Sequence, residues 1–541
     1  MNLLDLFAIP LARAPHAVAL RERDANGAWV EISFSELFER AERAAVGLAA
    51  RGLGRGDRVG FFLGNRAEFV IAYLAAIRLG AIVVPINLAY RKVELAHILT
   101  DAEPRLVITE RERLPRIEEL QGDERVSVRE VLLVEEIEDW SEGRRMRRPY
   151  GRPDGETVPA SMQDSVGPIG EQALDNEAVA EDAVAANALR SDDLAFLLYT
   201  SGTTGRSKGA MISHGNLVAT ISGLLVAWAW QPRDVLLLAL PLFHTHGLVV
   251  GLHCALAAGA TVELHPKFEA PEIVDRLVQG DATMFFGVPT MYVRLIPEIE
   301  ARPASQELAS AFARLRLFCS GSAPLAPETF ARFQELSGHA ILERYGMTET
   351  GMLLSNPYVG TRRPGTVGTP LPGVSARIVD ANGQIVPEGQ EGELWVDGGN
   401  VFSGYWRAPE KTAESFANDE SGRRWFRTGD LARRDPQHGA ITLLGRRGEL
   451  ILSGGFNVYP REIEEVLATA PGIREAAIVG RPHPEWGQVP VAYVVADHEL
   501  APLELIAFLK ERIAGFKIPR TFHRVDTLPK NALGKVLKHL L

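Results

Sequence analysis

The sequence alternates short, continuous apolar runs with segments of helical length through most of its first 350 residues. Representative runs are residues 58–64 (RVGFFLG), 81–87 (AIVVPIN), 235–241 (VLLLALP) and 283–287 (TMFFG). A strand that is buried on both faces has no polar side, and strands that alternate with helices pair in parallel. The pattern therefore predicts an α/β fold in which a large N-terminal domain contains doubly wound parallel sheets.

The pattern changes after about residue 364. Short strands divided by turn signals, of which Asn382-Gly383 is the strongest, predict a β-rich subdomain over about 364–445. The remaining residues, 450–541, read as helix, two strands, helix and strand. They predict a small, mobile α+β C-terminal domain.

These changes set the expected boundaries. We predict an N-terminal domain over 1–445, a hinge at 446–449 and a C-terminal lid domain beyond it. Residues 121–190 are polar, highly charged and poor in aromatic side chains, which is typical of a flexible surface insertion.

Composition excludes several classes of protein. A hydrophobic content of 46%, a charged content of 23% and a net charge of -11 fit a globular protein without a broad basic face for nucleic acid. The only cysteines, Cys254 and Cys319, lie far apart in apolar surroundings and predict no disulfide framework. No apolar run approaches the ~18 residues of a membrane helix, and no secretory signal is evident at the N-terminus. We predict a cytoplasmic protein with no membrane span.

The strongest motif is YTSGTTGRSKGAMISHGN, residues 199–216, which follows an apolar strand and precedes a helical stretch. Glycines that permit unusual backbone angles, hydroxyls and one lysine could cradle an oligophosphate. It differs from a Walker A loop, because Lys208 precedes glycine instead of Ser or Thr. A flexible polar loop is the alternative, which the position after a strand disfavours. The candidate ATP-binding residues are Thr200, Ser201, Gly202, Thr203, Thr204, Gly205 and Lys208.

Four further motifs follow in order. They are YGMTET (345–350), FRTGD (426–430), GRRGELILSGGFNVYPREIE (445–464) and LPKNALGK (528–535). With the glycine-rich loop they resemble the signature motifs of the adenylate-forming acyl-CoA synthetase superfamily, the AMP-binding enzymes, over nearly the whole chain. No Rossmann, nucleophile-elbow or zinc-protease motif competes with this resemblance.

The resemblance implies a two-step ligase reaction. A carboxylate attacks the α-phosphorus of ATP to give an acyl-adenylate and pyrophosphate, and the thiol of coenzyme A then displaces AMP. By the same matching, Lys535 is the catalytic lysine, Glu349 the Mg²⁺ ligand and Thr348 a neighbour of the α-phosphate. Positioned cations and donors are what phosphoryl chemistry needs.

The nucleotide pocket follows from the same motifs. The resemblance implies that Tyr345 packs against adenine and that Asp430, helped by Arg446, accepts hydrogen bonds from the ribose. Taken alone, an aspartate in a TGD sequence is more often a turn former. The further candidates for this pocket are Gly321, Ser322, Ala323 and Gly346.

A domain rotation and a coenzyme A site are also implied. Gly448 occupies the hinge position, where glycine lowers the steric cost of a large backbone change. Ser453, Gly454 and Gly455 would approach the pantetheine arm. Lys517 is a candidate for holding a phosphate of coenzyme A.

The acyl pocket is expected from residues 241–248 and 285–296, whose sequences most resemble malonyl-CoA and methylmalonyl-CoA synthetases. Arg294 lies in an otherwise apolar helix, and a short dicarboxylate keeps a distal charge that must be paired away from water. The alternative is an arginine that snorkels from an amphipathic helix.

His244, His246 and Met347 complete the expected acyl pocket. The two histidines could be hydrogen-bond donors or a zinc pair, although no third ligand is spaced nearby.

We therefore predict an AMP-forming acid–CoA ligase that forms malonyl-CoA or methylmalonyl-CoA. Its substrates would be ATP, coenzyme A and a small carboxylate, and it could be a monomer or a homodimer. The alternatives are a ligase for another aliphatic or aromatic acid, a ligase that loads a carrier protein, and a noncatalytic nucleotide-binding regulator.

Overall fold

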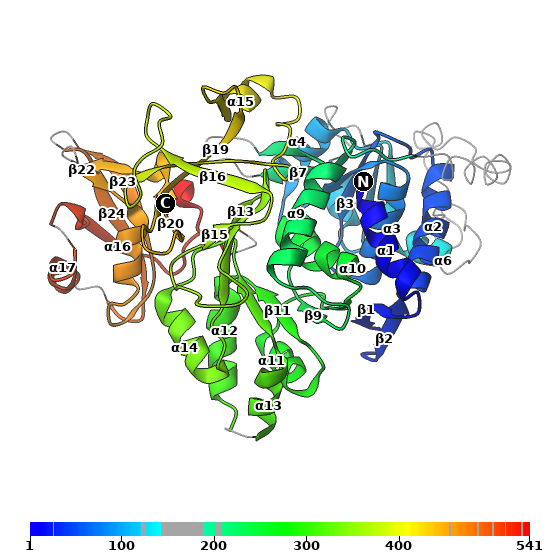
Figure 1. Cartoon of the computed structure of the whole chain (residues 1–541), viewed down its shortest axis with the longest axis horizontal. Coiled ribbons are helices and arrows are strands. Elements are labelled where there is room, and N and C mark those ends of the chain that lie inside the picture. The colour runs from blue at the N-terminus through cyan, green and yellow to red at the C-terminus, as the bar shows by residue number, and fades with distance from the viewer. Residues whose placement is uncertain are drawn as a thin grey trace.

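The computed structural model contains four β-sheets in the part of the chain that it describes. The described residues are 1–24, 26–120, 126, 128–141, 188–200, 207–303, 306–453, 456–483, 486–499, 502–513, 515–531 and 534–541. In Figure 1 the N-terminal helices lie at one end of the molecule and the C-terminal elements at the other.

The first sheet has six strands in the order β6-β5-β3-β4-β7-β8. All neighbours are parallel except β7 and β8. Its central strands are the apolar runs that the sequence predicts, because both faces of this sheet are covered. The strands are β3 (Arg58–Phe62), β4 (Ile82–Pro85), β5 (Leu106–Thr109), β6 (Glu130–Leu133), β7 (Leu194–Thr200) and β8 (Lys208–Ser213).

The second sheet has nine strands in the order β15-β14-β13-β12-β11-β9-β10-β1-β2. The six strands from β13 to β1 run parallel, and antiparallel strands close both edges. The strands are β1 (Val18–Arg23), β2 (Trp29–Ser33), β9 (Val235–Leu238), β10 (Thr261–Leu264), β11 (Met284–Gly287), β12 (Leu317–Ser320), β13 (Leu342–Met347), β14 (Gly351–Ser355) and β15 (Thr369–Pro370). The predicted α/β fold is confirmed.

The main hydrophobic core joins both sheets. The helix α3 (Ala67–Arg78) shows why, since ten of its twelve residues are buried. A helix with apolar side chains all round is stable only between two packed layers. On another face of the nine-stranded sheet, the helices α11 to α14 form the lower lobe in Figure 1.

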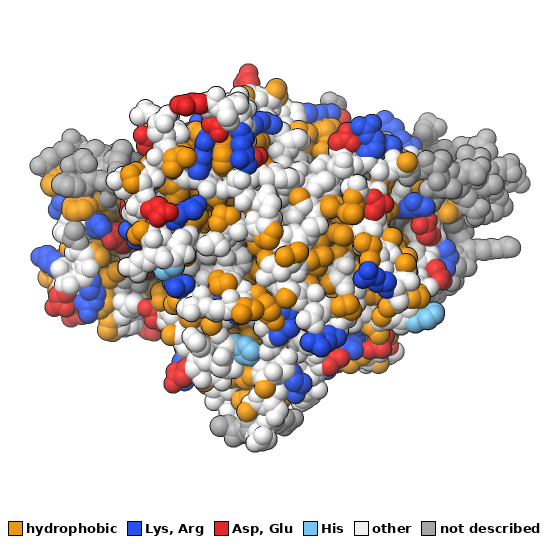
Figure 2. All heavy atoms as spheres, in the orientation of Figure 1, with side chains coloured by type: hydrophobic (Ala, Val, Ile, Leu, Met, Phe, Trp, Pro, Cys, Tyr) orange, Lys and Arg blue, Asp and Glu red, His pale blue; other side chains and the backbone are white. Residues whose placement is uncertain are grey.

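The other helices of the N-terminal region surround this core. The face seen in Figure 2 carries many apolar side chains. One helix, α9, has no charged residue, and its Val226 is 73% exposed. The helices are α1 (Leu3–Arg13), α2 (Phe34–Ala50), α4 (Lys92–Ala102), α5 (Leu114–Glu118), α6 (Val134–Ser141), α9 (His214–Ala227), the π-helix η1 (His246–His253), α10 (Cys254–Ala258), α11 (Ala270–Gln279), α12 (Pro289–Glu300), α13 (Gln306–Arg314), α14 (Pro327–Ser337) and α15 (Pro409–Glu414).

A third, antiparallel sheet forms the β-rich region that the turn signals predict. Gly383 adopts a φ of 82° in the turn at Asn382-Gly383, as a tight turn there requires. The strands are β16 (Val374–Val379), β17 (Glu391–Gly398), β18 (Phe416–Asn418), β19 (Arg424–Arg434) and β20 (Ile441–Arg446).

The C-terminal region is a small α+β unit with its own hydrophobic core. A five-stranded sheet packs against short helices, and β24 and β25 are its parallel pair. The elements are η2 (Arg447–Glu449), β21 (Ile451–Ser453), β22 (Phe456–Val458), α16 (Pro460–Leu467), β23 (Ile473–His483), β24 (Gly487–Ala496), α17 (Pro502–Lys510), η3 (Gly515–Lys517), β25 (Thr521–Arg524) and η4 (Lys538–Leu540).

The prediction that residues 121–190 form a flexible surface insertion is wrong for the stretch that contains β6 and α6. The strand β6 pairs in parallel with β5, and Trp140 of α6 packs against Gly47 and is 6% exposed. Most of the few apolar side chains of this acidic stretch are buried against the core. The acidic composition therefore suggested a flexible segment where the structure has an ordered strand and helix. Residues 142–187 lie outside the described part.

Two further expectations concern the cysteines and the membrane. Cys254 and Cys319 are both free and buried. Among the described residues, no helix combines the length and the apolar character needed to cross a bilayer.

A buried histidine predicts how stability depends on pH. His253 is fully buried, stacks on Tyr73 and Phe196, and neither ring nitrogen has a hydrogen-bond partner among the described residues. Burial lowers its pKa to about 3. In the unfolded chain the value is about 6.5, so the unfolded state takes up the proton first and stability falls as pH falls below about 6.5.

Between about pH 7.5 and about pH 5, we expect the free energy of unfolding of His253→Phe to fall by about 2 kcal/mol less than that of wild type. The reason is that the variant has no imidazole here to take up a proton on unfolding. Urea unfolding at both pH values measures this difference. The exposed His16 provides the control, since His16→Phe leaves the acid-induced loss unchanged. An equal loss in wild type and His253→Phe would contradict the prediction.

Candidate active site

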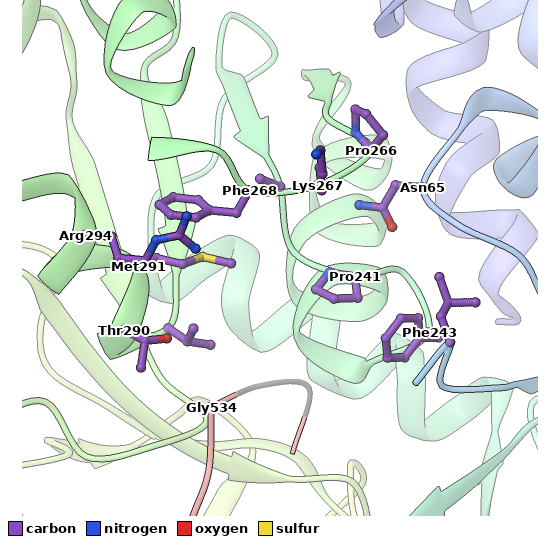
Figure 3. A pocket seen from close by; sticks show the side chains of 13 residues that line it. Asn65, Pro241, Phe243, Pro266, Lys267, Phe268, Thr290, Met291, Arg294 and Gly534 are labelled. Atoms are coloured by element: carbon purple, nitrogen blue, oxygen red, sulfur yellow. The ribbon is translucent and has the colours of Figure 1, made fainter. Parts of the chain in front are cut away.

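A cavity of about 280 Å³ opens where the parallel strands of both large sheets end. The loops that follow β3, β4, β9, β10 and β11 all contribute to it, which is the place where open α/β sheets bind ligands. Figure 3 shows the side chains converging on this space, with the C-terminal loop of Gly534 below Thr290. The lining residues are Asn65, Leu88, Ala239, Pro241, Phe243, Pro266, Lys267, Phe268, Val288, Thr290, Met291, Arg294 and Gly534.

The amide of Asn65 fixes the wall of the cavity. It donates to the carbonyl oxygens of Leu240 at 2.9 Å and His265 at 3.0 Å, and it accepts from the backbone of Leu242 at 2.8 Å. These bonds tie the ends of strands from the two sheets together. Sequence reasoning missed Asn65, although a polar residue just after an apolar strand was the available signal.

Two cationic residues line the cavity. Arg294 is exposed, and its guanidinium lies over the ring of Phe268, 5.0 Å from the centroid. Lys267, which sequence reasoning missed, pairs with Glu269 at 2.8 Å. Of the four predicted acyl-pocket residues, Arg294 is the one that lines this cavity.

The two predicted pocket histidines lie beside the cavity in a drier environment. Burial lowers the pKa of His244 to about 4, and burial and then the charge of Arg344 hold the pKa of His246 well below its usual range. Both rings are therefore neutral at neutral pH. The described residues contain no cluster of three side chains suited to a metal ion, so nothing in them supports the zinc pair.

A buried charge cluster lies at the end of β13. Asp430 of β19 is 6% exposed, accepts a hydrogen bond from the hydroxyl of Tyr345, and pairs with Nε of Arg446 at 2.7 Å. Burial raises the pKa of Asp430 although Arg446 opposes the shift. The structure thus brings together the three residues that the resemblance assigns to the nucleoside.

The predicted catalytic lysine belongs to the same cluster. Gly534 has a φ of 77°, and a side chain there would touch Thr290, so the loop fits closely against α12. Lys535 keeps contact with solvent, but partial burial lowers its pKa. The charge of Arg446 adds to this shift, and Asp430 opposes it.

Glu349 is connected to the phosphate-loop strand by a residue that the motifs did not reveal. The hydroxyl of Tyr405 donates to Oε1 of Glu349 at 2.9 Å, and Nζ of Lys208 lies over the Tyr405 ring, 5.5 Å from its centroid. Thr348 precedes Glu349 and is half-buried. Tyr405 was missed because its partners lie far away in the sequence.

The turn after β12 is backed by a buried arginine. The guanidinium of Arg344 lies so close to Gly321 that a Cβ there would come within 2.6 Å of three of its atoms. Ser322 has a φ of 70°, and its hydroxyl is 3.3 Å from Nδ1 of His246. Ala323 is half-buried in the same turn. Arg344 was also missed, because only its burial makes it notable.

Other predicted residues have local explanations. Gly346 allows β13 and β14 to approach, since a Cβ would lie 2.1 Å from the carbonyl oxygen of Gly351. Met347 lies near Tyr345, whose hydroxyl is 3.8 Å from its sulfur. Thr200, at the end of β7, pairs in register with Lys208.

Neither Ser453 nor Lys517, the predicted coenzyme A residues that the structure describes, lines the cavity. Ser453 is 2% exposed inside the C-terminal sheet, and Lys517 pairs with Glu462 at 2.6 Å. Gly448 lies in η2, where an added Cβ would meet nothing within 4 Å, so this conformation does not require glycine there. Ser201, Gly202, Thr203, Thr204, Gly205, Gly454 and Gly455 lie outside the described residues.

Comparison with known proteins identifies the family. Residues 7–406 match the AMP-binding enzyme family, and residues 462–535 match its C-terminal domain. The chain belongs to the AMP-binding enzymes. The predicted superfamily is confirmed, and with it an AMP-forming ligase of the acyl-CoA synthetase class.

The relatives of this AMP-binding enzyme differ in the acids they are named for. The mitochondrial malonate–CoA ligase ACSF3 of Mus musculus is 34% identical over 94% of this chain and 85% of its own length. A feruloyl-CoA synthase from Amycolatopsis is 33% identical over 98% of this chain and 96% of its own length. MatB from Rhodopseudomonas palustris, whose ATP-bound crystal structure is known, is 39% identical over 100% of this chain and 98% of its own. The TM-score between the two structures is 0.82.

The buried pair at Asp430 generates a stability prediction. We expect Asp430→Asn to cost about 3–5 kcal/mol, because it leaves the Arg446 charge without its partner. The more exposed pair of Asp397, on β17, with Arg423, just before β19, is the control, and Asp397→Asn costs less than about 1 kcal/mol. Urea unfolding of both variants measures the difference, and equal losses would contradict it.

Proposed function

We propose that this AMP-binding enzyme is a malonate–CoA ligase, which converts malonate or methylmalonate, ATP and coenzyme A into the acyl-CoA, AMP and pyrophosphate. The observation that carries the proposal is a small cavity at the carboxyl ends of the strands with Arg294 at its side. A short diacid needs little room and one opposite charge for its distal carboxylate.

The charge cluster supports the adenylation step. Asp430 can accept hydrogen bonds from the ribose, with Tyr345 beside the base. Lys535 follows Gly534, which lines the cavity, and its charge interacts with those of Arg446 and Asp430. Its ammonium group can therefore hold the attacking carboxylate next to the α-phosphate. A fixed cation there stabilises the negative charge that grows on the transferred group.

The residues present also suit a magnesium ion. Glu349 is 6% exposed and offers a hard carboxylate oxygen, and Mg²⁺ is usually bound by one or two carboxylates together with substrate phosphates. Glu349 would hold the ion, which neutralises charge on the phosphates. Tyr405 keeps this carboxylate in place by its hydrogen bond.

Thiolation then requires a second arrangement of the C-terminal domain. We propose that residues 446–449 are the hinge and that Ser453, Gly454 and Gly455 come near the pantetheine arm only after rotation. The TM-score of this structure is 0.82 to ATP-bound MatB and 0.72 to the apo enzyme, which supports an adenylation-like arrangement here. Lys517 would have to leave Glu462 to bind a phosphate.

A second candidate is a ligase for an aromatic acid. The feruloyl-CoA synthase relatives and the apolar side chains of the cavity favour it. The cytoplasm is the compartment that we propose, since both cysteines are free, although the vertebrate malonate–CoA ligases are named mitochondrial.

The substrate proposal predicts a clear preference. We expect AMP formation that depends on ATP and coenzyme A to be fastest with malonate or methylmalonate, compared with acetate, octanoate, benzoate and ferulate. Arg294→Ala should lower kcat/KM for malonate about 10-fold or more and leave acetate unchanged. A wild-type preference for a monocarboxylate would overturn the assignment, and unchanged malonate selectivity in the variant would remove the role of Arg294.

The mechanism predicts that Lys535 acts in one half-reaction. We expect Lys535→Met to slow malonate-dependent pyrophosphate release at least ~100-fold and to leave thiolation of supplied malonyl-adenylate nearly unchanged. Lys530 in the same loop pairs with Glu475, and Lys530→Met provides the control. Adenylation at an undiminished rate in Lys535→Met would refute the mechanism.

A further inference from the structure

The charges of three carboxylates act on Lys535, yet its ammonium group forms no ion pair with a described residue. Burial and then the charge of Arg446 lower its pKa. The carboxylates of Asp430, Glu449 and Glu349 oppose this shift. An ammonium group near several carboxylates gains free energy by pairing with one of them. The structure must therefore contain contacts that keep these carboxylates from doing so.

Two of the three carboxylates are held by other groups deep in the protein. Asp430 pairs with Arg446 at 2.7 Å, and Glu349 accepts a hydrogen bond from the hydroxyl of Tyr405 at 2.9 Å. Each carboxylate residue is only 6% exposed, so neither side chain has room to turn toward another cation. They act on Lys535 through their charge and leave its ammonium group unpaired.

The third carboxylate, Glu449, is held by a second lysine of the C-terminal segment. Its Oε2 lies 3.3 Å from Nζ of Lys538, three residues after Lys535, and Glu449 has no other ion pair or hydrogen bond among the described residues. Its side chain is 29% exposed and lies in η2, so it has room to turn. Lys538 therefore decides whether this carboxylate is available to Lys535.

The fold keeps Lys538 in the place where it can hold that carboxylate. Its Nζ also lies 2.7 Å from Oε1 of Glu464 in α16, and the same oxygen accepts the backbone N–H of Ile478 at 2.7 Å. The backbone N–H of Leu537 donates to the carbonyl oxygen of Pro529 at 2.8 Å, which fixes the chain just before Lys538. The lysine is thus anchored to the C-terminal domain independently of Glu449.

We propose that Lys538 is a positioning residue for adenylation, which holds Glu449 so that the ammonium group of Lys535 stays free for the attacking carboxylate and the α-phosphate. This inference rests on the role that the proposed function gives to Lys535. An ammonium group that is paired in the ground state must give up that pair before it can stabilise the transition state, and this lowers the rate. Thiolation does not use Lys535, so the effect is confined to the first half-reaction.

The test separates the two half-reactions in a set of variants. Pyrophosphate release with the acid that wild type uses fastest measures adenylation, and supplied acyl-adenylate with coenzyme A measures thiolation. The variants are Lys538→Met, Lys538→Arg, Glu449→Gln and the double variant Lys538→Met/Glu449→Gln. Lys530→Met is the matched control, because Lys530 lies in the same loop and pairs at 2.6 Å with Glu475, which does not act on Lys535.

We expect Lys538→Met to lower kcat for adenylation about 10-fold, because the released Glu449 pairs with Lys535, and to leave thiolation within about 2-fold of wild type. The double variant should recover adenylation to within about 3-fold, since it lacks the competing charge. Lys538→Arg should do the same, because it keeps a cation beside Glu449. Glu449→Gln and Lys530→Met should stay within about 3-fold of wild type in both half-reactions.

The pH dependence provides a readout that a purely structural role would not change. An added carboxylate favours the charged form of an ammonium group. The alkaline limb of the adenylation rate, where Lys535 loses its proton, should therefore move to higher pH in Lys538→Met. In the double variant it should return to the wild-type position or below, since the glutamine at position 449 carries no charge.

Three results would overturn the inference. They are a Lys538→Met protein with wild-type adenylation, one that slows both half-reactions equally, and a double variant as slow as Lys538→Met. If Lys538→Met does not fold, Glu449→Gln decides, because slow adenylation in that protein would mean that the ion pair itself is needed. Undiminished adenylation in Lys535→Met overturns the proposed mechanism, whatever the variants at Lys538 do.

Discussion

The candidate site depends on the hydrogen bond and the ion pair that the carboxylate of Asp430 forms. It lies on β19, accepts the hydroxyl of Tyr345 from the end of β13 and pairs with Arg446 of β20. A buried carboxylate is tolerated only when it is paired and hydrogen-bonded, so this group fixes the β-rich sheet against the edge of the nine-stranded sheet. The charges of Asp430 and Arg446 are thus fixed before the C-terminal loop packs against them. The loop then needs only the contact of Gly534 with Thr290 to bring Lys535 to these charges.

The position of the cavity follows from strand direction. Parallel strands place their carboxyl ends at one edge, and the loops after five strands from two sheets meet there. Their backbone groups must still be satisfied, and Asn65 does this by bonding to Leu240, Leu242 and His265. The pocket is therefore held by hydrogen bonds between loops, which leaves its apolar side chains free to differ among relatives that are named for different acids.

Sequence could predict the strands and the α/β fold, because each is carried by a contiguous pattern. The family resemblance named Tyr345, Asp430 and Arg446, which the structure brings into contact. It could not predict Tyr405 or Arg344, since their importance comes from contacts with Glu349 and Gly321 that only the fold creates. The error at residues 128–141 has a related cause. The acidic composition of that stretch suggested an exposed insertion, whereas one tryptophan against Gly47 and one edge strand are enough to bind it to the core.

The electrostatics of the site separate two kinds of buried group. Burial keeps the imidazoles of His244 and His246 neutral, because a histidine can release its proton when it is desolvated. An arginine cannot do so at neutral pH, so Arg344 remains a cation although its Nε and Nη2 atoms have no hydrogen-bond partner among the described residues. Burial therefore costs the fold free energy at Arg344 that it does not cost at the two histidines, since the arginine keeps its charge.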